Sequence, residues 1–360
     1  MGREQILRVL MVGASFFLLC AAALVTTFVS ARPHPSDRVS VTVDDQQRRV
    51  DISIDGQPFT SYIWPERLAK PVLYPLRTAK GTIITRGYPL DPRPGEHVDH
   101  PHHAGLWLNY ESVNGIDFWD NSEAIKPQDA PKMGTIRHRS VVSAKGGSEE
   151  GELEVEADWV TYEKKALLEE HTRFVFRGGP NFRSVDRITT LSALGEKVLF
   201  ADAKDGMLGL RVVRALEAPS EKPEVFTDRS GRATTVAKLD NTGVNGVYLT
   251  SEGKRGEAAW GTRGRWCNLS GKVGEEPVTI SIFDHPSNPG FPTYWHARGY
   301  GLFAANPLGQ KIFSNGKEEL NLTLAPGQSV TFRYRILISS EILTPENTEA
   351  AYKAFAAAYH

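Results

Sequence analysis

Beyond residue 38, apolar and polar positions alternate along most of the chain in short runs. Residues 39–43 and 50–54 both alternate, and Asp55-Gly56 supplies a turn directly after the second run. Residues 152–160 alternate acidic with apolar side chains, which predicts a strand with one face in water. Glycine-bearing turns separate such runs, and no long helical period lies between them. The pattern therefore predicts an all-β protein and argues against alternating β and α units.

Two stretches depart from this alternation. Residues 344–346 provide an N-cap, a proline for the first helical position and an acid for the first turn. Aromatic residues then recur at spacings of three and four, which predicts a helix over residues 345–358 that packs against a sheet. The polar stretch 217–244 predicts a long surface loop, either a lid or tolerated extra length.

The N-terminus has the layout of a secretory signal peptide. Arg3 and Arg8 precede an apolar run that ends at Val29, and residues 29–31 offer small side chains to a signal peptidase. An uncleaved membrane anchor is the alternative. We therefore expect a periplasmic or secreted protein with four parts: a signal peptide (1–31), a linker (32–38), one β-sandwich domain (39–343) and a C-terminal helix packed on it (344–360).

Composition and charge narrow the classes of function. The 42 Lys+Arg and 43 Asp+Glu nearly cancel, so the chain has no basic surface for nucleic acid. Hydrophobic residues make up 40% and charged residues 24%, which is typical of a globular domain and not of a disordered chain. One stretch alone, at the N-terminus, is apolar for long enough to span a bilayer. Beyond it Cys267 is the one cysteine, so no internal disulfide is expected. Composition leaves the oligomeric state open.

Histidines concentrate in two segments that also contain proline and glycine. The first covers residues 95–107 and is followed by an Asn-Gly-Ile-Asp-Phe-Trp block at 114–119, and the second covers 283–298. Six of the ten histidines and three of the seven tryptophans lie in these segments. The tripeptide Asp-His-Pro occurs in both, at 99–101 and 284–286. Loops attached to strands carry catalytic and binding residues more often than they contribute to a hydrophobic core, so these segments are the candidate site.

Three interpretations of the histidine segments stay open. Imidazoles and carboxylates could carry out acid–base chemistry on a sugar, with indole rings stacked on its C–H faces. His100 and His102, two positions apart, could instead hold a divalent metal ion, with His97, Asp99 or His296 completing the shell, although no HExxH motif occurs. In the third interpretation the histidines only satisfy loop backbone groups. We favour substrate binding or acid–base chemistry without a tightly held metal, because four histidines fall within seven positions.

The candidate residues fall into two groups. His100 and His103 are the first choices as acid or base, with His296 opposite them. Asp99 and Asp117 would orient these imidazoles. The predicted substrate-binding residues comprise tryptophans for stacking, arginines for an anionic or keto oxygen, and further histidines and aspartates: His97, His102, Trp107, Trp119, Asp205, Arg211, Asp284, His285, Trp295 and Arg298.

Four sequence blocks resemble the signature of the PmoA-like family, which carries the name methane oxygenase. They are residues 99–107, 114–119, 295–298 and 301–307. The resemblance spans about residues 39–340, and Ala104 stands where other members often have arginine. It implies a bacterial context of polysaccharide degradation and sugar oxidation. It also implies a fold similar to the β-supersandwich of galactose mutarotases and related carbohydrate enzymes.

We therefore expect an exported protein built on an antiparallel β-sandwich of the supersandwich type, with a carbohydrate as its ligand. The expected activity is hydrolysis, elimination or epimerisation of a sugar. A non-catalytic glycan-binding module and, from the family name, a metal-dependent oxygenase are the alternatives. The site requires the two histidine segments to meet at one concave face.

Overall fold

The structure is a computed structural model that describes residues 38–359. The predicted signal peptide (1–31) and residues 32–37 of the predicted linker lie outside the described residues, so their roles stay predictions. Within residues 38–359, no helix is both long enough and apolar enough to cross a membrane.

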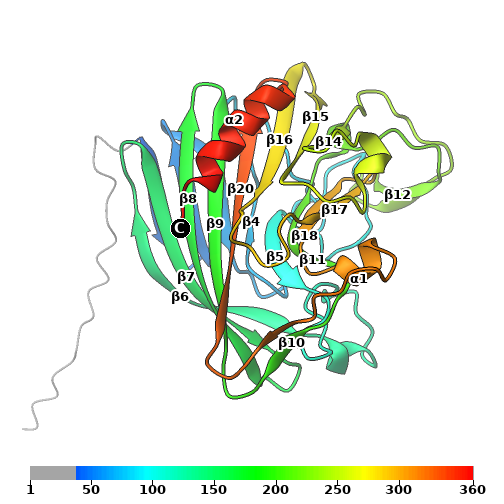
Figure 1. Ribbon diagram of the computed structural model, residues 1–360. Helices are drawn as coiled ribbons and strands as arrows, with labels where there is room; N and C mark the ends of the chain where they lie inside the picture. Colours follow the sequence, from blue (N-terminus) through cyan, green and yellow to red (C-terminus); the bar gives the residue numbers. More distant parts are fainter. Residues whose placement is uncertain (1–37, 360) are drawn as a thin grey trace, which may run out of the picture. The chain divides into compact units, whose positions relative to one another are not determined.

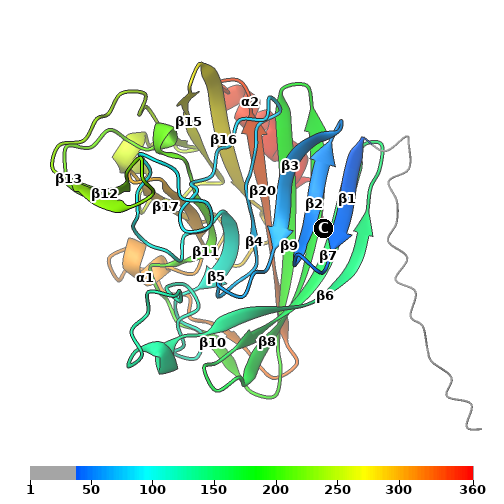
Figure 2. The same ribbon diagram turned by 180° about the vertical axis from the view of Figure 1, so that it is seen from behind.

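Two large antiparallel sheets of eight strands each make up most of the fold (Figures 1 and 2). The first sheet contains, in spatial order, β1 (Val39–Asp44), β2 (Arg49–Ile54), β3 (Gln57–Ile63), β4 (Val72–Leu73), β5 (Leu106–Tyr110), β11 (Gly206–Arg211), β18 (Leu302–Asn306) and β17 (Tyr294–Arg298). The second contains β14 (Val247–Thr250), β15 (Trp266–Val273), β16 (Glu276–Asp284), β20 (Ser329–Ser339), β9 (Phe182–Ala193), β8 (Ala166–Gly179), β7 (Glu150–Val160) and β6 (Thr135–Lys145). Two short pairs are β10 (Val198–Phe200) with β19 (Leu322–Leu324), and β12 (Glu224–Thr227) with β13 (Ala233–Val236).

The main hydrophobic core fills the space between the two large sheets. Leu108 and Leu210 come from the first sheet, Phe174 and Ile336 come from the second, and all four are almost completely buried. Strand β7 shows the alternation that the sequence predicted, with apolar side chains buried and acidic side chains partly exposed. Burial of one face of each sheet is the main stabilising contribution in such a sandwich. The prediction of an all-β antiparallel sandwich is confirmed.

The predicted C-terminal helix is confirmed as α2 (Pro345–Ala356), which lies on the outer side of the second sheet (Figure 1). The Thr344 hydroxyl caps it by accepting a hydrogen bond from the Asn347 backbone N–H at 3.3 Å. Tyr352 and Phe355 on its inner side form a small second core with Phe283 of β16. The described residues also contain a single-turn helix, α1 (Gln310–Phe313).

Two elements differ from the prediction. The stretch 217–244 contains the hairpin β12–β13, which is tied to residues 95–98 by backbone bonds from Gly95 to Thr227 (2.7 Å) and from Val98 to Val225 (2.9 Å). The second difference is β17, which was expected to belong to a loop. Both of its faces are buried, so the hydrophobic alternation that reveals a half-exposed strand is absent there.

Candidate functional site

The outer face of the first sheet carries a row of side chains that strand pairing brings together. Trp107 on β5 pairs with Gly209 on β11, and Gly209 pairs with Ala304 on β18. Ala304 pairs in turn with His296 on β17. A side chain on residue 209 is excluded, because a Cβ there would lie 2.4 Å from the Trp107 ring. Glycine therefore lets the indole lie against the backbone of β11, where it forms the floor of the candidate site.

Asp99 is the centre of the charged cluster above this floor. One of its oxygens, Oδ1, accepts hydrogen bonds from Arg86 and, at 2.7 Å, from Arg211, and both guanidinium groups are completely buried. The other oxygen accepts a hydrogen bond from His100 Nδ1 at 2.5 Å. Burial raises the pKa of Asp99, but the His100 hydrogen bond and the two arginine charges outweigh it, so the pKa lies well below its usual range. Asp99 is thus a fixed negative charge.

Arg86 also fixes the loop that carries the histidines. It donates hydrogen bonds to the backbone carbonyls of His100 (3.0 Å) and His103 (3.1 Å). Burial lowers the pKa of Arg86 to about 9, which leaves it charged at neutral pH. His100 itself has a left-handed backbone, with φ of 42°. Such conformations cost energy in residues other than glycine and are enriched at functional sites.

His100 is the accessible imidazole of the cluster. Its side chain is 43% exposed, whereas His102 is 10% and His296 is 3% exposed. The His100 ring is stacked between Tyr300, with ring centres 5.3 Å apart, and His103, with ring centres 4.8 Å apart. Its Nδ1 is bound by Asp99, and no hydrogen bond within the described residues engages Nε2. This nitrogen is therefore free to exchange a proton with a ligand.

Two buried imidazoles also lie next to carboxylates. His102 Nε2 is 3.2 Å from Asp120 Oδ1, and His296 Nδ1 is 3.3 Å from Asp205 Oδ1. Burial lowers the pKa of His102 to about 2 and that of His296 to about 3, so both are neutral. His296 Nδ1 makes no hydrogen bond, so its relation to Asp205 is one of proximity. Burial raises the pKa of Asp205 to about 6. The neighbouring His100 contributes to both lowered histidine pKa values, so the three histidine–carboxylate pairs share one electrostatic environment.

The remaining acid–base candidate, His103, is buried behind His100. Its Nδ1 lies 3.2 Å from an Arg211 nitrogen, and its ring is stacked on Trp107 with ring centres 5.2 Å apart. Burial and the nearby positive charges hold its pKa well below the usual range. Of the three histidines predicted as acid or base, His100 alone is thus accessible in the described structure.

Acidification is expected to destabilise the fold through His102, His103 and His296. Their folded-state pKa values are lowered, so the unfolded chain binds more protons and stability is lost as the pH falls below about 6.5. Each histidine contributes up to about 1.4 kcal/mol per pH unit. Asp117, Asp205 and Asp284 offset part of this loss, because burial raises their pKa values to about 6, 6 and 7, and their carboxyl groups bind protons in the folded state over the same range. Urea unfolding at about pH 7.5, 6.5 and 5.5 measures this loss. The variant His102→Gln isolates one histidine and should lower the slope of stability against pH by up to about 1.4 kcal/mol per pH unit relative to wild type. A slope equal to that of wild type would contradict the assignment.

The structure does not bring the second Asp-His-Pro block to this cluster. Asp284 and His285 follow β16, which belongs to the second sheet. Asp284 accepts hydrogen bonds from Asn288 and Thr293, both at 2.8 Å, and His285 Nε2 lies 2.7 Å from the carbonyl of Ala358. These contacts brace the turn after β16 and the C-terminus. Of the second histidine segment, the part on β17 reaches the site.

Several residues predicted to bind a substrate are instead buried or paired with other groups of the protein. Trp107 and Trp119 pack on each other, with ring centres 5.3 Å apart, and are 0% and 1% exposed. Trp295 points into the main core, because neighbouring side chains on a strand face opposite sides and His296 takes the outer side. None of the three presents an open ring to a ligand. Arg211 is committed to Asp99, and is likewise not free to hold a substrate oxygen.

Asp117 shapes the backbone of the site loop. It accepts hydrogen bonds from the backbone N–H groups of Trp119 (2.7 Å) and Asp120 (3.0 Å), and the structure does not place an imidazole against it. Burial raises its pKa to about 6. Its contacts orient Asp120, the partner of His102, so it acts on an imidazole only through that neighbour.

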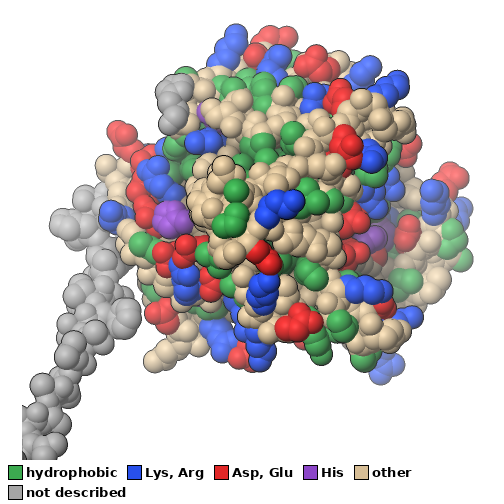
Figure 3. All heavy atoms as spheres, turned by 60° about the horizontal axis from the view of Figure 1, so that its bottom comes forward, with side chains coloured by type: hydrophobic (Ala, Val, Ile, Leu, Met, Phe, Trp, Pro, Cys, Tyr) green, Lys and Arg blue, Asp and Glu red, His purple; other side chains and the backbone are tan. Residues whose placement is uncertain are grey.

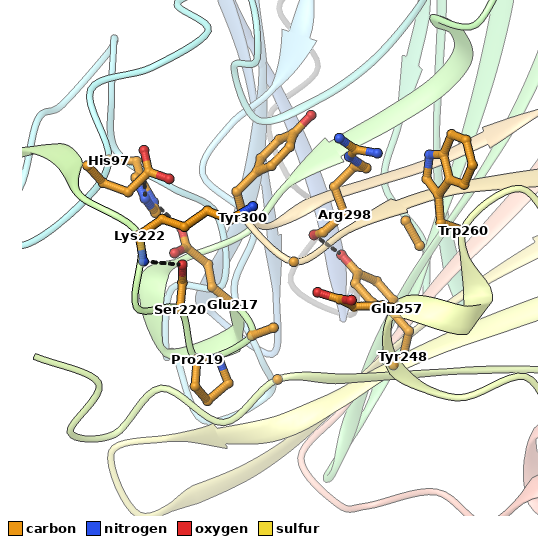
Figure 4. A pocket seen from close by; sticks show the side chains of 16 residues that line it. His97, Glu217, Pro219, Ser220, Lys222, Tyr248, Glu257, Trp260, Arg298 and Tyr300 are labelled. Atoms are coloured by element: carbon orange, nitrogen blue, oxygen red, sulfur yellow. Dashed lines mark hydrogen bonds and ion pairs between the residues drawn. The ribbon is translucent and has the colours of Figure 1, made fainter. Parts of the chain in front are cut away.

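A cavity of about 410 Å³ adjoins the cluster on the far side of Tyr300 (Figure 4). Its lining includes two predicted residues, His97 and Arg298, and two that the sequence did not single out, Trp260 and Tyr300. His97 Nδ1 is 2.9 Å from Glu217 Oε1. Neither Trp260 nor Tyr300 stands in a local motif, so no sequence signal could have marked them. Figure 3 shows that acidic and basic side chains are interspersed over one face, with a histidine set back in a hollow between them.

The described residues do not contain a group of three or more His, Cys, Asp or Glu side chains arranged to hold a metal ion. The divalent metal ion therefore stays an alternative that rests on the sequence alone.

Fold and cluster together define a class of antiparallel β-sandwich protein with histidine–carboxylate pairs on the outer face of one sheet. The family model described as "Family of unknown function (DUF6807)" matches residues 49–353, and the chain belongs to this family. Its name differs from the PmoA-like name that the sequence blocks suggested. A search of curated proteins finds no match.

The expected likeness to galactose mutarotase-like proteins is found among solved structures. One is a galactose mutarotase-like protein from Clostridium acetobutylicum, with a TM-score of 0.40, 11% identity, and coverage of 85% of this chain and 99% of that chain. Galactose 1-epimerase from Lactobacillus acidophilus NCFM has a TM-score of 0.36 and 10% identity, covering 84% and 98% of the respective chains. The Slr1438 protein from Synechocystis sp. PCC 6803 has a TM-score of 0.34 and 10% identity, covering 88% and 99%. These likenesses concern the arrangement of strands alone.

Proposed function

We propose that this chain is an exported enzyme that carries out acid–base chemistry on a sugar, with His100 as the group that takes up the proton. The observation that carries the proposal is an exposed imidazole whose Nδ1 is held by Asp99, a carboxylate fixed by two buried arginines. Export rests on the signal peptide predicted at residues 1–31.

The arrangement supports a defined division of roles. Nε2 of His100 would accept a proton from a sugar hydroxyl or from a carbon next to a carbonyl, and Asp99 would stabilise the imidazolium that forms. The pair of Asp205 and His296 would return a proton on the other side. With a pKa of about 6, Asp205 is protonated in part of the population at mildly acidic pH and can serve as the acid.

Proton removal fits this site better than glycoside hydrolysis. Hydrolysis of a glycoside usually uses one carboxylic acid as the proton donor and a second carboxylate as base or nucleophile. Asp99 has a strongly lowered pKa and accepts hydrogen bonds through both oxygens, so it is suited to neither role. Epimerisation or elimination, in which a histidine base removes a proton, agrees with the geometry. A sugar agrees with the charged and aromatic side chains that line the adjoining cavity.

The direct test is His100→Gln, assayed on a panel of aldoses, ketoses and uronic acids. The assay is ¹H NMR in D₂O, which reports anomeric interconversion, loss of C–H signals by solvent exchange, and new alkene signals from elimination. We expect the substitution to lower turnover by about 10²–10⁴-fold, the usual contribution of a general base, with little change in stability.

A matched control is His171→Gln. His171 is similarly exposed (46%) and also lies near a carboxylate, 3.6 Å from Glu154, but it stands on β8 of the second sheet. The His171→Gln substitution should leave turnover unchanged. Equal turnover by wild type and His100→Gln would overturn the proposal. Sugar binding without product, at the same affinity in His100→Gln, would instead identify a glycan-binding module.

A further inference from the structure

The cavity beside Tyr300 has an unsatisfied polar atom in its wall. The side chain of His97 is 4% exposed, and its Nδ1 is fixed by Glu217, which in turn is bound by Arg214 at 2.9 Å. Its Nε2 is buried without a hydrogen-bond partner and lies 4.0 Å from a Glu224 carboxylate oxygen. Buried polar groups in native proteins are nearly always paired, so an orphaned nitrogen at a cavity wall indicates a ligand group that completes it.

The opposite wall combines an aromatic ring with a free guanidinium (Figure 4). Trp260 is 38% exposed, and the Arg298 guanidinium lies 5.6 Å from the centre of its indole and 5.7 Å from that of Tyr300. Arg298 makes no ion pair among the described residues, so its donors are available to ligand hydroxyl groups. An aromatic face beside hydrogen-bonding groups suits the alternating C–H and O–H faces of a sugar ring.

The charge of the cavity lining and the cavity volume further restrict the chemical class of the ligand. Apart from Glu217, which Arg214 neutralises, the lining carries the acids Glu224 and Glu257 and the bases Lys222 and Arg298. The charges balance, which favours an uncharged ligand over a uronate. The volume of about 410 Å³ lies within the roughly 300–1,000 Å³ of small-molecule sites.

Tyr300 joins this cavity to the cluster, because it lines the cavity and is also stacked against His100 with ring centres 5.3 Å apart. We infer that the cavity binds a second, neutral sugar unit, so that the substrate is a disaccharide or a longer oligosaccharide whose reacting unit lies at His100. This inference rests on the proposed function and adds the class of substrate to it.

The test compares binding of single sugars and of disaccharides built from them: glucose with maltose and cellobiose, and galactose with lactose. Dissociation constants are measured by isothermal titration calorimetry on the purified protein. Wild type should bind at least one disaccharide 10-fold or more tightly than its component monosaccharides. Trp260→Ala should weaken binding of that disaccharide by 10-fold or more and change monosaccharide binding less than twofold.

Arg298→Gln provides a second variant on an exposed side chain and should show the same selectivity. Tyr162→Ala is the control, since Tyr162 is 57% exposed in the turn after β7 and remote from the cavity lining. Equal losses for both ligand classes, or no preference of wild type for any disaccharide, would overturn the inference. If Trp260→Ala is selective but His100→Gln keeps full turnover, the second-unit cavity is supported and the proposed chemistry is overturned.

Discussion

Replacing Asp99 with alanine should lower the free energy of unfolding by about 3–5 kcal/mol and remove turnover, because this one carboxylate pairs with two buried guanidinium groups. The side chains of Arg86 and Arg211 are 0% exposed, and Asp99 is the acidic group that pairs with both. Without it, two like charges stay buried together and His100 loses the group that orients its ring. Urea unfolding gives the stability change, and the sugar assay gives the loss of turnover.

Two further variants test whether the charge of Asp99 and the burial of its arginine partners cause these losses of stability and turnover. Asp99→Asn keeps the shape and removes the charge, so it should remain destabilising and nearly inactive. Asp158→Ala is the matched control: its carboxylate is 30% exposed and pairs at 3.1 Å with Arg139, which is 39% exposed and has other acidic partners. It should cost about 1 kcal/mol or less, as exposed ion pairs usually do. An Asp99→Ala protein as stable as wild type would show that the two arginines find other partners.

Trp107→Ala should also lower the free energy of unfolding by about 3–5 kcal/mol, the usual cost of deleting a fully buried large aromatic side chain. The indole is 0% exposed and packs against Trp119, His103 and the backbone of Gly209. Removing it leaves a cavity beneath the histidine stack. Denaturation of the purified variant measures the loss, and turnover should fall because His103 and His100 lose their support.

The control for this prediction is Trp260→Ala, which removes the same side chain from a position that is 38% exposed. Its effect on stability should stay within about 1 kcal/mol. A stable Trp107→Ala protein that has lost sugar binding would contradict the supporting role of Trp107, and would favour the direct contact with a sugar ring that the sequence suggested.

Much of the fold could be predicted because each half-buried strand repeats its apolar side chains every second residue. The alternation over β7 and the capping residues at 344–346 each report their own local structure. Strand β17 was missed because both of its faces are buried, so alternation gives no signal there. The hairpin β12–β13 was missed because each strand has four residues and neither shows an alternation of buried and exposed positions.

The site could be predicted only in part, because the sequence indicates which residues are neighbours in the chain and not which distant segments meet. The first histidine segment forms a cluster within itself, since Asp99 and His100 are neighbours in the chain. The repeated Asp-His-Pro block looked equivalent, but Asp284 and His285 follow a strand of the other sheet. Composition cannot distinguish an indole that supports a site from one that contacts a ligand, and here Trp107, Trp119 and Trp295 are buried.

The class of fold, the C-terminal helix and the loop that carries the accessible histidine can be predicted from the amino-acid sequence, because they depend on residues close together in the chain. The distant groups that surround this histidine depend on the tertiary structure: Arg86, Arg211, Tyr300 and the His296–Asp205 pair. These groups come from three separate segments, at residue 86, at residues 205–211 and at residues 296–300, and the order of strands β11, β18 and β17 in the first sheet brings the last two together. Register is set by the burial of whole strands against the other sheet, which no local pattern contains.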